Sequence, residues 1–246
     1  NLPYIIVSHG PALRIYPTNP GTGVGRRGRT ETFLELHLDT TSEDHLPLLW
    51  YLFSSEALGD NGTFKQLLDN SKRFATSLGE RLRERVYQQV VPSLATAILN
   101  AQSLGVPTQQ DLDQTYRATL TLLFRILFVA YGEDKDLLPY KTNELYRAHS
   151  LKQKAQQLIT LREQGNPFDE HSYSHWDETV RLFEAVDKGS TELTVPAYNG
   201  GLFSDDPAIS ETGALLSTIR LTSSEFGPAL SYILIDDGPE GVGAVD

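Results

Sequence analysis

Two histidines four residues apart are the first candidates for chemistry in this sequence. His171 and His175 have four acidic neighbours, Asp169, Glu170, Asp177 and Glu178. Imidazole and carboxylate groups on one face of a helix can together bind a transition metal. However, Gly165-Asn-Pro167 precedes the pair and Ser-Tyr-Ser separates it, which favours a loop that leads into a helix cap. We therefore predict no metal site.

Three arginines, Arg26, Arg27 and Arg29, form the densest cationic cluster near the start of the chain. They overlap the string Gly23-Val-Gly-Arg-Arg-Gly28, which matches the G-x-G-x-x-G pattern of dinucleotide-binding proteins. That pattern needs a helix that opens at the glycines, so that its N–H groups meet the pyrophosphate. Here the following residues alternate like a strand, so a hairpin loop is the better interpretation. Such a loop could grip a phosphate backbone through its arginines, and the alternative is a plain solvated loop.

The longest apolar run of the chain contains a single charge, Arg125. The run extends from Thr119 to Tyr131 and is well short of the roughly 20 residues that span a bilayer. A buried charge has to be paired or to reach solvent. The sequence predicts a structural ion pair with an acid that follows the run, with a functional role for Arg125 as the alternative. The candidate partners are Glu133, Asp134 and Asp136.

No standard catalytic motif stands out. The G-x-S-x-G nucleophile elbow, the Walker A lysine loop and the zinc-binding H-E-x-x-H are absent from the sequence. The Asn/Asp-Pro-Pro-Tyr/Phe loop of amino-methylating DNA methyltransferases is also absent, and no acidic pair followed by Glu-x-Lys indicates a metal-dependent nuclease. We therefore expect no complete active site in this chain.

The elements that would position these residues predict a mainly α fold. We expect a helical domain with a small β segment at the N-terminus and a short β/turn region near the C-terminus. Residues 1–40 form the β segment, with strands expected over Leu2–Ser8, Ala12–Tyr16 and Thr32–Leu38. A strand that begins so near the first residue would normally have further partners.

Residues 41–204 form the expected helical domain. Ser42 and Thr63 are candidate N-caps, and the apolar residues after Thr63 recur at helical spacing. Pro92 should kink or restart that second helix. Further helices are expected at about 109–133, 151–163 and 175–187, of which the first is the most apolar and should be the most buried.

Residues 205–246 form an expected acidic linker. They contain eight acidic residues and only one basic residue, Arg220, so they carry seven of the chain's net negative charges (8 − 1). Their last residues, Asp237-Gly-Pro-Glu-Gly-Val-Gly243, are typical of a flexible connector.

Composition narrows the function classes further. The 246 residues carry a formal net charge of −11, so any DNA contact would need a local basic patch. The absence of cysteine excludes disulfides and thiol nucleophiles and fits the cytoplasm. The chain also lacks methionine and begins at Asn1. We expect it to be a piece of a longer protein, cut inside a sheet at one end and inside a linker at the other.

Three segments together resemble a known family. They are Phe74 to Val91, Leu123 to Pro139, and Val195-Pro-Ala-Tyr-Asn-Gly-Gly-Leu-Phe203. In this order and spacing they resemble the region before the methyltransferase domain in type IIG-like restriction-modification enzymes. These are restriction enzyme methylase subunits related to the adenine methylases of phage-exclusion systems. The resemblance covers nearly the whole chain.

The resemblance implies an architecture for a longer parent protein. A nuclease-like domain comes first, and its closing strands resemble the first two strands expected here. A helical connector, a SAM-dependent adenine N6-methyltransferase and a target-recognition region follow. The family's catalytic residues have no matching positions in this chain, so we expect no cofactor here; the parent would use S-adenosylmethionine, and Mg²⁺ if it cleaves DNA. The implied partners are DNA, through the parent, and the adjacent nuclease and methyltransferase domains.

The motif residues also have structural interpretations. Acidic residues should form the polar end of the long apolar helix, and the paired glycines should adopt positive φ in a tight turn that pins the next two residues into the core. We expect this structural role, with a direct DNA or domain contact as the alternative. The residues concerned are Arg125, Tyr131, Glu133, Asp134, Tyr198, Asn199, Gly200, Gly201, Leu202 and Phe203.

Three functional hypotheses follow. The first is the helical connector of a DNA restriction-modification or phage-defence methyltransferase, which basic residues on one concave face would favour. The second is a stand-alone helical protein-interaction module, which an exposed apolar groove would favour. The third and weakest is a nuclease in its own right, which would need a metal-binding acidic cluster beside a lysine on the first sheet.

Overall fold

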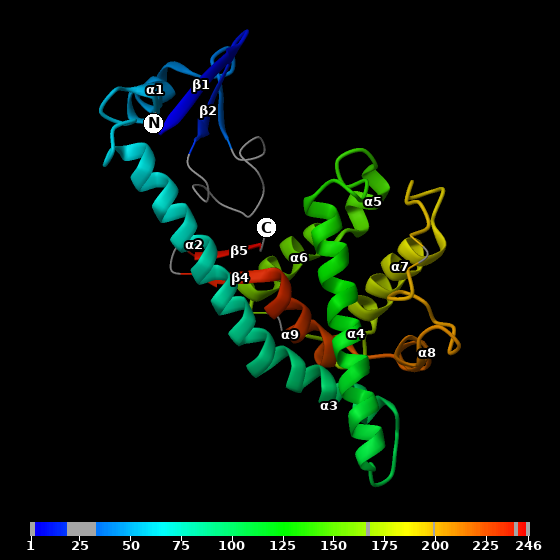
Figure 1. Ribbon diagram of the computed structural model, residues 1–246. Helices are drawn as coiled ribbons and strands as arrows, with labels where there is room; N and C mark the ends of the chain where they lie inside the picture. The colour runs from blue at the N-terminus through cyan, green and yellow to red at the C-terminus, as the bar shows by residue number, and fades with distance from the viewer. Residues whose placement is uncertain (1–2, 19–32, 166–167, 199, 239–240, 245–246) are drawn as a thin grey trace. The chain divides into compact units, whose positions relative to one another are not determined.

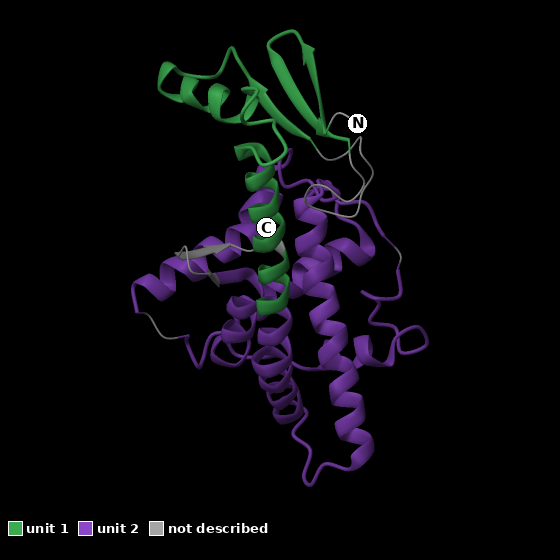
Figure 2. Ribbon diagram, turned by 60° about the vertical axis from the view of Figure 1, so that its left-hand side comes forward, with its two compact units in different colours: residues 1–81 green, residues 82–246 purple. Residues whose placement is uncertain are grey.

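The computed structural model describes residues 3–18, 33–165, 168–198, 200–238 and 241–244 (Figure 1). Helices dominate these residues, with a three-stranded antiparallel sheet near the N-terminus and a two-stranded sheet near the C-terminus. The expected mainly α class is therefore confirmed. The chain divides into two compact units, residues 1–81 and 82–246 (Figure 2). In the described part, the helices are too short or too polar to cross a membrane.

The first unit begins with the small sheet. Strands β1 (Tyr4–His9), β2 (Ala12–Pro17) and β3 (Leu34–His37) lie in that order and pair antiparallel. Gly10 permits the tight turn between β1 and β2 because its φ of 57° lies in the left-handed region. The three strands occur where the sequence predicts them, although β3 is shorter than the expected 32–38.

Helices follow the sheet within the first unit. A 3₁₀ turn (Glu43–His45) leads into α1 (Leu46–Phe53), which α2 (Thr63–Arg85) follows. Thr63 is the first residue of α2 rather than its cap, and its hydroxyl donates to the Tyr51 carbonyl. Ser42 precedes the 3₁₀ turn rather than α1. Its hydroxyl lies 3.0 Å from the His45 Nδ1 and caps no helix N–H.

A compact core joins the sheet to these helices. Ile15 of β2, Leu52 of α1 and Phe64 of α2 are buried together, and the Tyr4 ring meets the Phe64 ring edge-on at 4.9 Å. The expected β segment of residues 1–40 is thus not a separate body. It shares its core with α1 and the start of α2, and the division between the units falls at Arg81 instead.

The second unit packs helices around one larger core. Its elements are the π-helical turn Val86–Val90, α3 (Val91–Ala101), α4 (Gln109–Asp134), α5 (Glu144–His149), α6 (Leu151–Glu163), α7 (Ser174–Lys188), α8 (Glu211–Thr218), α9 (Ser223–Leu234), β4 (Ile235–Gly238) and β5 (Gly241–Ala244). The helix changes its hydrogen-bond pattern before Pro92 but does not end there. The backbone stays helical at Arg85, Val90 and Val91, and the π-helical turn directly before Pro92 accommodates the N–H that proline lacks.

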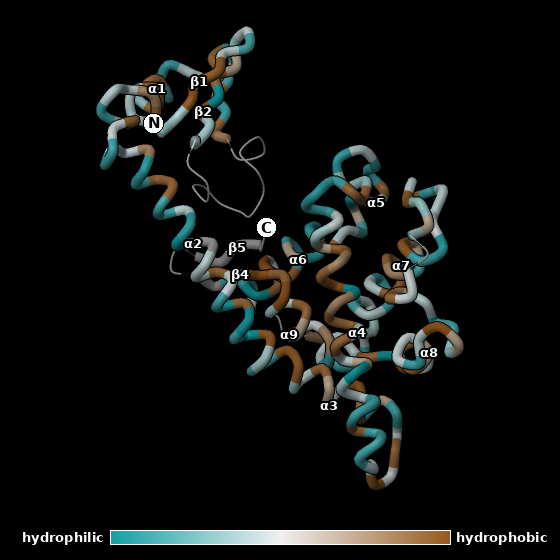
Figure 3. The backbone as a smooth tube through the Cα atoms, viewed as in Figure 1, coloured by the Kyte–Doolittle hydropathy of each residue, from teal (hydrophilic) through white to brown (hydrophobic). Residues whose placement is uncertain are grey.

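Helix α4 is the central element of this unit. Thr108 and Asp111 form a reciprocal capping box at its start. Leu122, Ile126 and Val129 are fully buried, and the helix packs against α3, α6, α7 and α8. Its hydrophobic stretch is visible in Figure 3. The most apolar predicted helix is therefore a core helix, as expected.

The expected linker over residues 205–246 needs a correction. Residues 211–218 and 223–234 form α8 and α9, and Phe226 and Leu230 of α9 are completely buried. Glu211 and Glu225 lie in the first turns of these helices, where the helix dipole favours negative charge. At least two of the acidic residues in this region therefore stabilise the N-termini of helices and do not indicate a linker. The short strands β4 and β5 follow.

Candidate functional site

The third resemblance segment folds onto the second around Arg125. The Arg125 Nε donates to the Leu202 carbonyl at 2.7 Å, and its Nη2 donates to the Ser204 carbonyl at 3.0 Å. Only 6% of the Arg125 surface is exposed. The buried guanidinium therefore links the middle of α4 to main-chain oxygens that lie 77 and 79 residues further along the chain.

The predicted ion pair of Arg125 is wrong. The sequence predicts an acidic partner among Glu133, Asp134 and Asp136. Glu133 lies more than two helical turns beyond Arg125 on α4, roughly 12 Å along the axis, whereas the carbonyls lie directly beside the guanidinium. Burial lowers the pKa of Arg125, and the carboxylates of Asp187 and Asp205 oppose that shift.

Aromatic rings close the same junction. Phe128 of α4 meets Phe203 at 5.3 Å and Tyr198 at 5.8 Å between ring centroids, both edge-on. The Tyr198 hydroxyl donates to the Leu137 carbonyl at 2.7 Å. Phe203 is buried and Leu202 packs against the core. These contacts agree with the structural interpretation of the turn.

The prediction that the turn needs positive φ at its glycines is wrong for Gly201. The Phe203 N–H donates to the Gly200 carbonyl at 3.2 Å, so a turn is present. Gly201, however, does not adopt positive φ. A Cβ on Gly201 would lie 3.3 Å from the Ile209 Cγ2, so close packing is the physical reason for a small residue there. Asn199 lies outside the described residues.

A glycine that sequence reasoning missed completes the junction. Gly213, in the first turn of α8, faces the Arg125 side chain. A Cβ there would overlap the Ser204 carbonyl oxygen and lie 2.7 Å from the Arg125 Nη2. The Gly213 N–H itself donates to the Ser210 hydroxyl that caps α8, at 3.0 Å. No sequence pattern indicates this role, because it depends on which helix lies against α4.

Glu133 is the second buried polar residue of the α4 motif. Its carboxylate accepts hydrogen bonds from the Tyr146 hydroxyl at 3.0 Å, the Leu151 N–H at 2.9 Å and the Lys152 N–H at 3.0 Å. The last two groups are the first N–H donors of α6, which favour a negative partner. Burial raises the pKa of Glu133, and these hydrogen bonds act against the increase. Glu133 therefore fixes the start of α6 on the end of α4.

The remaining motif residues of α4 lie at its surface end. Asp134 pairs with Lys135 and lies 3.7 Å from the Lys152 ammonium, and its hydrogen bond with Lys135 lowers the pKa of its carboxyl group. About half of the Tyr131 side chain is exposed. The DNA-binding candidates Arg26, Arg27 and Arg29 lie outside the described residues, so the structure does not position them.

An apolar groove borders this end of α4. Most of its lining is aliphatic or aromatic, and charged groups from α4 and α6 form part of its rim. The groove is formed by Leu82, Leu127, Ala130, Tyr131, Glu133, Asp134, Lys135, Leu151, Lys152, Ala155, Ile233 and Leu234. All of these residues belong to the second unit.

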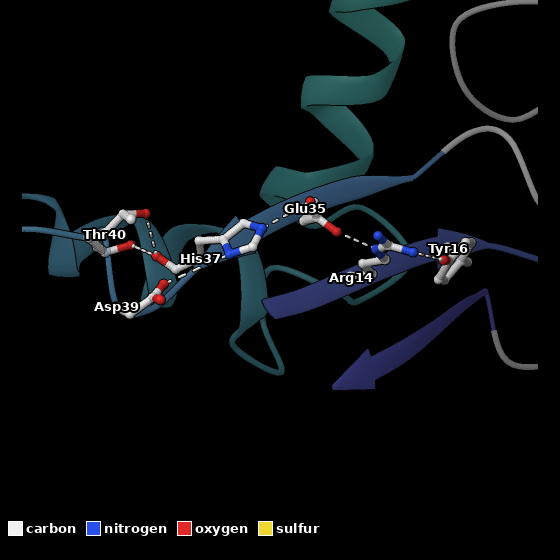
Figure 4. A network of polar contacts seen from close by, with 7 residues as sticks. Arg14, Tyr16, Glu35, His37, Asp39 and Thr40 are labelled. Atoms are coloured by element: carbon white, nitrogen blue, oxygen red, sulfur yellow. Dashed lines mark hydrogen bonds and ion pairs between the residues drawn. The ribbon is translucent and has the colours of Figure 1, made fainter. Parts of the chain in front are cut away.

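The first unit holds a polar network that sequence reasoning also missed (Figure 4). Arg14 of β2 pairs with Glu35 of β3, whose other oxygen lies 3.1 Å from the His37 Nε2. The Arg14 guanidinium lowers the pKa of Glu35. Asp39 lies 3.8 Å from the His37 Nδ1. The alternation of apolar and polar residues in β3 could have indicated that Glu35 and His37 lie together, because residues two apart on a strand share a face.

The described part of the chain brings no metal site together around His171 and His175 or around His37. Among the described residues, no group of three or more histidine, aspartate or glutamate side chains is arranged so that it could hold a metal ion. His175 instead stacks edge-on with Phe168 at 5.8 Å. Asp169 accepts the His171 and Ser172 N–H groups in a local turn. The nuclease hypothesis therefore gains no support, because the cation beside the β3 acids is an arginine that Glu35 already binds.

Comparisons with known proteins leave the family open. Scans against protein-family models, curated proteins and solved structures find no match to this chain.

Proposed function

We propose that this chain is the helical connector of a DNA restriction-modification or phage-defence adenine-N6 methyltransferase. In this role it would hold adjacent nuclease and methyltransferase domains and contact the DNA backbone, without a complete active site of its own. The proposal implies a cytoplasmic protein and a parent that uses S-adenosylmethionine. It rests on the resemblance of three sequence segments, to which the geometry adds one observation.

That observation is the junction around Arg125. Two of the three resembling segments, which lie far apart in the sequence, share a hydrogen bond from Arg125 to the Leu202 carbonyl and an edge-on contact between the Phe128 and Phe203 rings. Arg125 also donates to the carbonyl of Ser204, the residue directly after the third segment. Segments that form one structural motif should contact each other, as these two do. The contact supports the proposal because it gives a structural reason for both segments to occur in one motif: the turn at 195–203 packs against the middle of α4.

The hydrogen bonds of the motif residues also favour a scaffold over a catalyst. Arg125 donates to main-chain carbonyls, and Glu133 accepts from the N-terminus of α6 and from Tyr146. Catalytic groups need access to a substrate, whereas both of these side chains are almost fully buried. Their chemistry connects helices to one another.

The second candidate function, a stand-alone protein-interaction module, has its own observation in its favour. The apolar groove between α4, α6 and α9 is a surface that a partner helix could cover. A connector could use the same groove to bind a neighbouring domain. The two functions therefore differ in whether the chain also binds DNA.

A DNA titration tests the proposal. We expect the chain to bind duplex DNA weakly at low salt, with an affinity that falls steeply as salt rises because phosphate contacts release counterions. Replacement of Arg26, Arg27 and Arg29 by alanine should weaken binding and flatten the salt dependence. Fluorescence anisotropy with a labelled duplex measures both quantities.

A matched control separates a specific contact from net charge. This control also removes three positive charges, but from exposed positions of α2, by the substitutions Lys65→Ala, Lys72→Ala and Arg73→Ala. Binding to DNA should fall far less in this variant. If neither the wild type nor the control binds DNA at low salt, the connector proposal loses its DNA role and the interaction module is favoured. Calorimetric titration should also detect no S-adenosylmethionine binding; micromolar binding would contradict the proposal.

A further inference from the structure

The two edges of the N-terminal sheet differ sharply. The β3 edge has four residues, two of which are Glu35 and His37. Charged groups and short length are devices that protect a sheet edge from further pairing. The β1 edge has six residues, Tyr4–His9, and contains neither a lysine, an arginine, an acid nor a proline. Only β1 therefore lacks the usual protection.

The side chains of β1 are exposed on both faces. Ile5, Ile6 and Val7 are 53%, 46% and 44% exposed, although all three are strongly apolar. In the described part of the chain, β1 pairs only with β2. Because backbone groups alternate in direction along a strand, half of the β1 N–H and C=O groups point away from β2. An additional strand would satisfy these groups and cover the three side chains.

The pairing of β1 with β2 shows which face each side chain occupies. Ile6 lies opposite Ile15, and residues directly opposite each other share a face. Ile15 is completely buried against Leu52 and Phe64. Ile6 therefore extends the apolar core face of the sheet by one strand, to a point where nothing in the described chain covers it fully. Ile5 and Val7 lie on the opposite face.

We propose that the β1 edge pairs antiparallel with β1 of a second copy of this chain. The strand is complementary to itself, because it contains no lysine, arginine or acid and a two-fold axis at Ile6 would place Ile6 opposite Ile6 of the second copy. Ile5 would then lie opposite Val7 of the second copy, so apolar pairs would form on both faces. This register also joins the core faces of the two sheets, whereas a shift by one residue would turn one sheet over. The result is a six-stranded sheet. The inference goes beyond the proposed function, under which strands of the adjacent nuclease-like domain would compete for the same edge.

The association should be weak. A single pair of six-residue strands buries less surface than a stable interface of roughly 1,200 Å² or more. We expect a monomer–dimer equilibrium in the micromolar range or weaker. Sedimentation of the full chain should show a mass that rises with concentration from 27.4 kDa toward twice that value.

Charge substitutions at Ile6 test the pairing. Ile6→Lys and Ile6→Glu each place like charges opposite one another on the two-fold axis, so each variant alone should dimerise at least tenfold more weakly. An equal mixture of the two should recover dimers, because lysine then faces glutamate. Loss of folding could not produce this recovery, and Val106→Lys, at an exposed site in the second unit, is the control that should leave dimerisation unchanged.

Cross-linking tests the register. The chain contains no cysteine, so Ile6→Cys introduces a single thiol. Mild oxidation should link two Ile6→Cys chains much faster than two Ile5→Cys chains, whose thiols would lie diagonally apart, or two Val106→Cys chains. A wild-type chain that stays monomeric at all concentrations would overturn the proposal. So would equal cross-linking of the three cysteine variants, or an absence of recovery in the charge mixture.

Discussion

The two units of this protein use the same pair of side chains in opposite environments. In the first unit, Arg14 and Glu35 pair across the sheet surface, where water reaches both groups (Figure 4). In the second unit, Arg125 and Glu133 are buried on one helix and bind main-chain groups of other elements. Burial, rather than residue type, therefore decides how much an arginine or a glutamate contributes to the stability of the fold.

The physical reason is desolvation. An exposed ion pair exchanges its contacts for water at little net cost. A buried arginine or glutamate has no such exchange, so the loss of either leaves its partners without hydrogen bonds in a poorly solvated place. Matched substitutions in the two units test whether burial makes this difference.

The largest expected effect comes from Arg125→Ala compared with Arg14→Ala. Removal of Arg125 leaves the Leu202 and Ser204 carbonyls without their donors and opens a cavity beside Phe203, so we expect the second unit to lose about 3–5 kcal/mol. Arg14→Ala should produce no resolvable change. Urea unfolding measures both.

Tryptophan fluorescence can follow the second unit separately. The chain has two tryptophans, Trp176 buried in the second unit and Trp50 exposed in the first. In a Trp50→Phe background, the fluorescence change on unfolding reports Trp176 alone. Arg125→Ala should shift the Trp176 transition in that background, whereas Arg14→Ala should leave the unfolding transition of the whole chain, followed by circular dichroism, unchanged. Equal losses of stability in the two variants would contradict the comparison.

The next effect comes from two glycines. Gly213→Ala places a methyl group against the Ser204 carbonyl and the Arg125 guanidinium, so we expect a loss of about 3 kcal/mol, at the upper end of overpacking costs. Gly79→Ala in α2 meets open space and should stabilise the helix by about 0.5–1 kcal/mol. Thermal unfolding should therefore shift in opposite directions; a neutral Gly213→Ala would show that α8 is loosely packed.

Glu133→Gln compared with Glu35→Gln should give a smaller effect. The amide nitrogen of glutamine would face the Lys152 N–H in one orientation and the Leu151 N–H together with the Tyr146 hydroxyl in the other, so at least one of the hydrogen bonds from α6 is lost. We expect a cost of about 2 kcal/mol for the second unit and little change for the exposed Glu35 position. Hydrogen exchange at the Leu151 and Lys152 amides should also accelerate in Glu133→Gln, which a general loss of stability would not confine to α6.

The smallest effect is a pH dependence from His175. Burial lowers the pKa of His175, the Lys154 ammonium lowers it further, and Glu178 opposes both. The unfolded chain, with an ordinary histidine pKa of about 6.5, therefore takes up a proton first as pH falls. The stabilisation is complete above that pH and is lost as pH falls toward the lowered value.

His175→Gln should remove this part of the acid sensitivity, whereas His9→Gln, at an exposed position in the first unit, should not. Melting temperatures at about pH 7.5 and about pH 5.5 bracket the window. If the acid-induced decrease is identical in wild type and His175→Gln, another group causes it.

Local signals in the sequence indicate the mainly α class and several of its helices. Apolar residues at helical spacing locate α2 and α4 closely, and Pro92 lies in the first turn of α3, because these signals act within a few residues. The same local signals failed in residues 211–234. There, acidic residues at helix starts were interpreted as a linker.

The tertiary structure alone decided the partners of the buried charges. A sequence pattern shows that Arg125 needs a partner, but the nearest acids along the chain are not its neighbours in space. Its acceptors are main-chain carbonyls, which every residue carries, so no residue type marks them. The role of Gly213 and the apolar groove beside Tyr131 depend in the same way on which helices pack together. Contacts between residues far apart in the sequence cannot be predicted from patterns within a few residues.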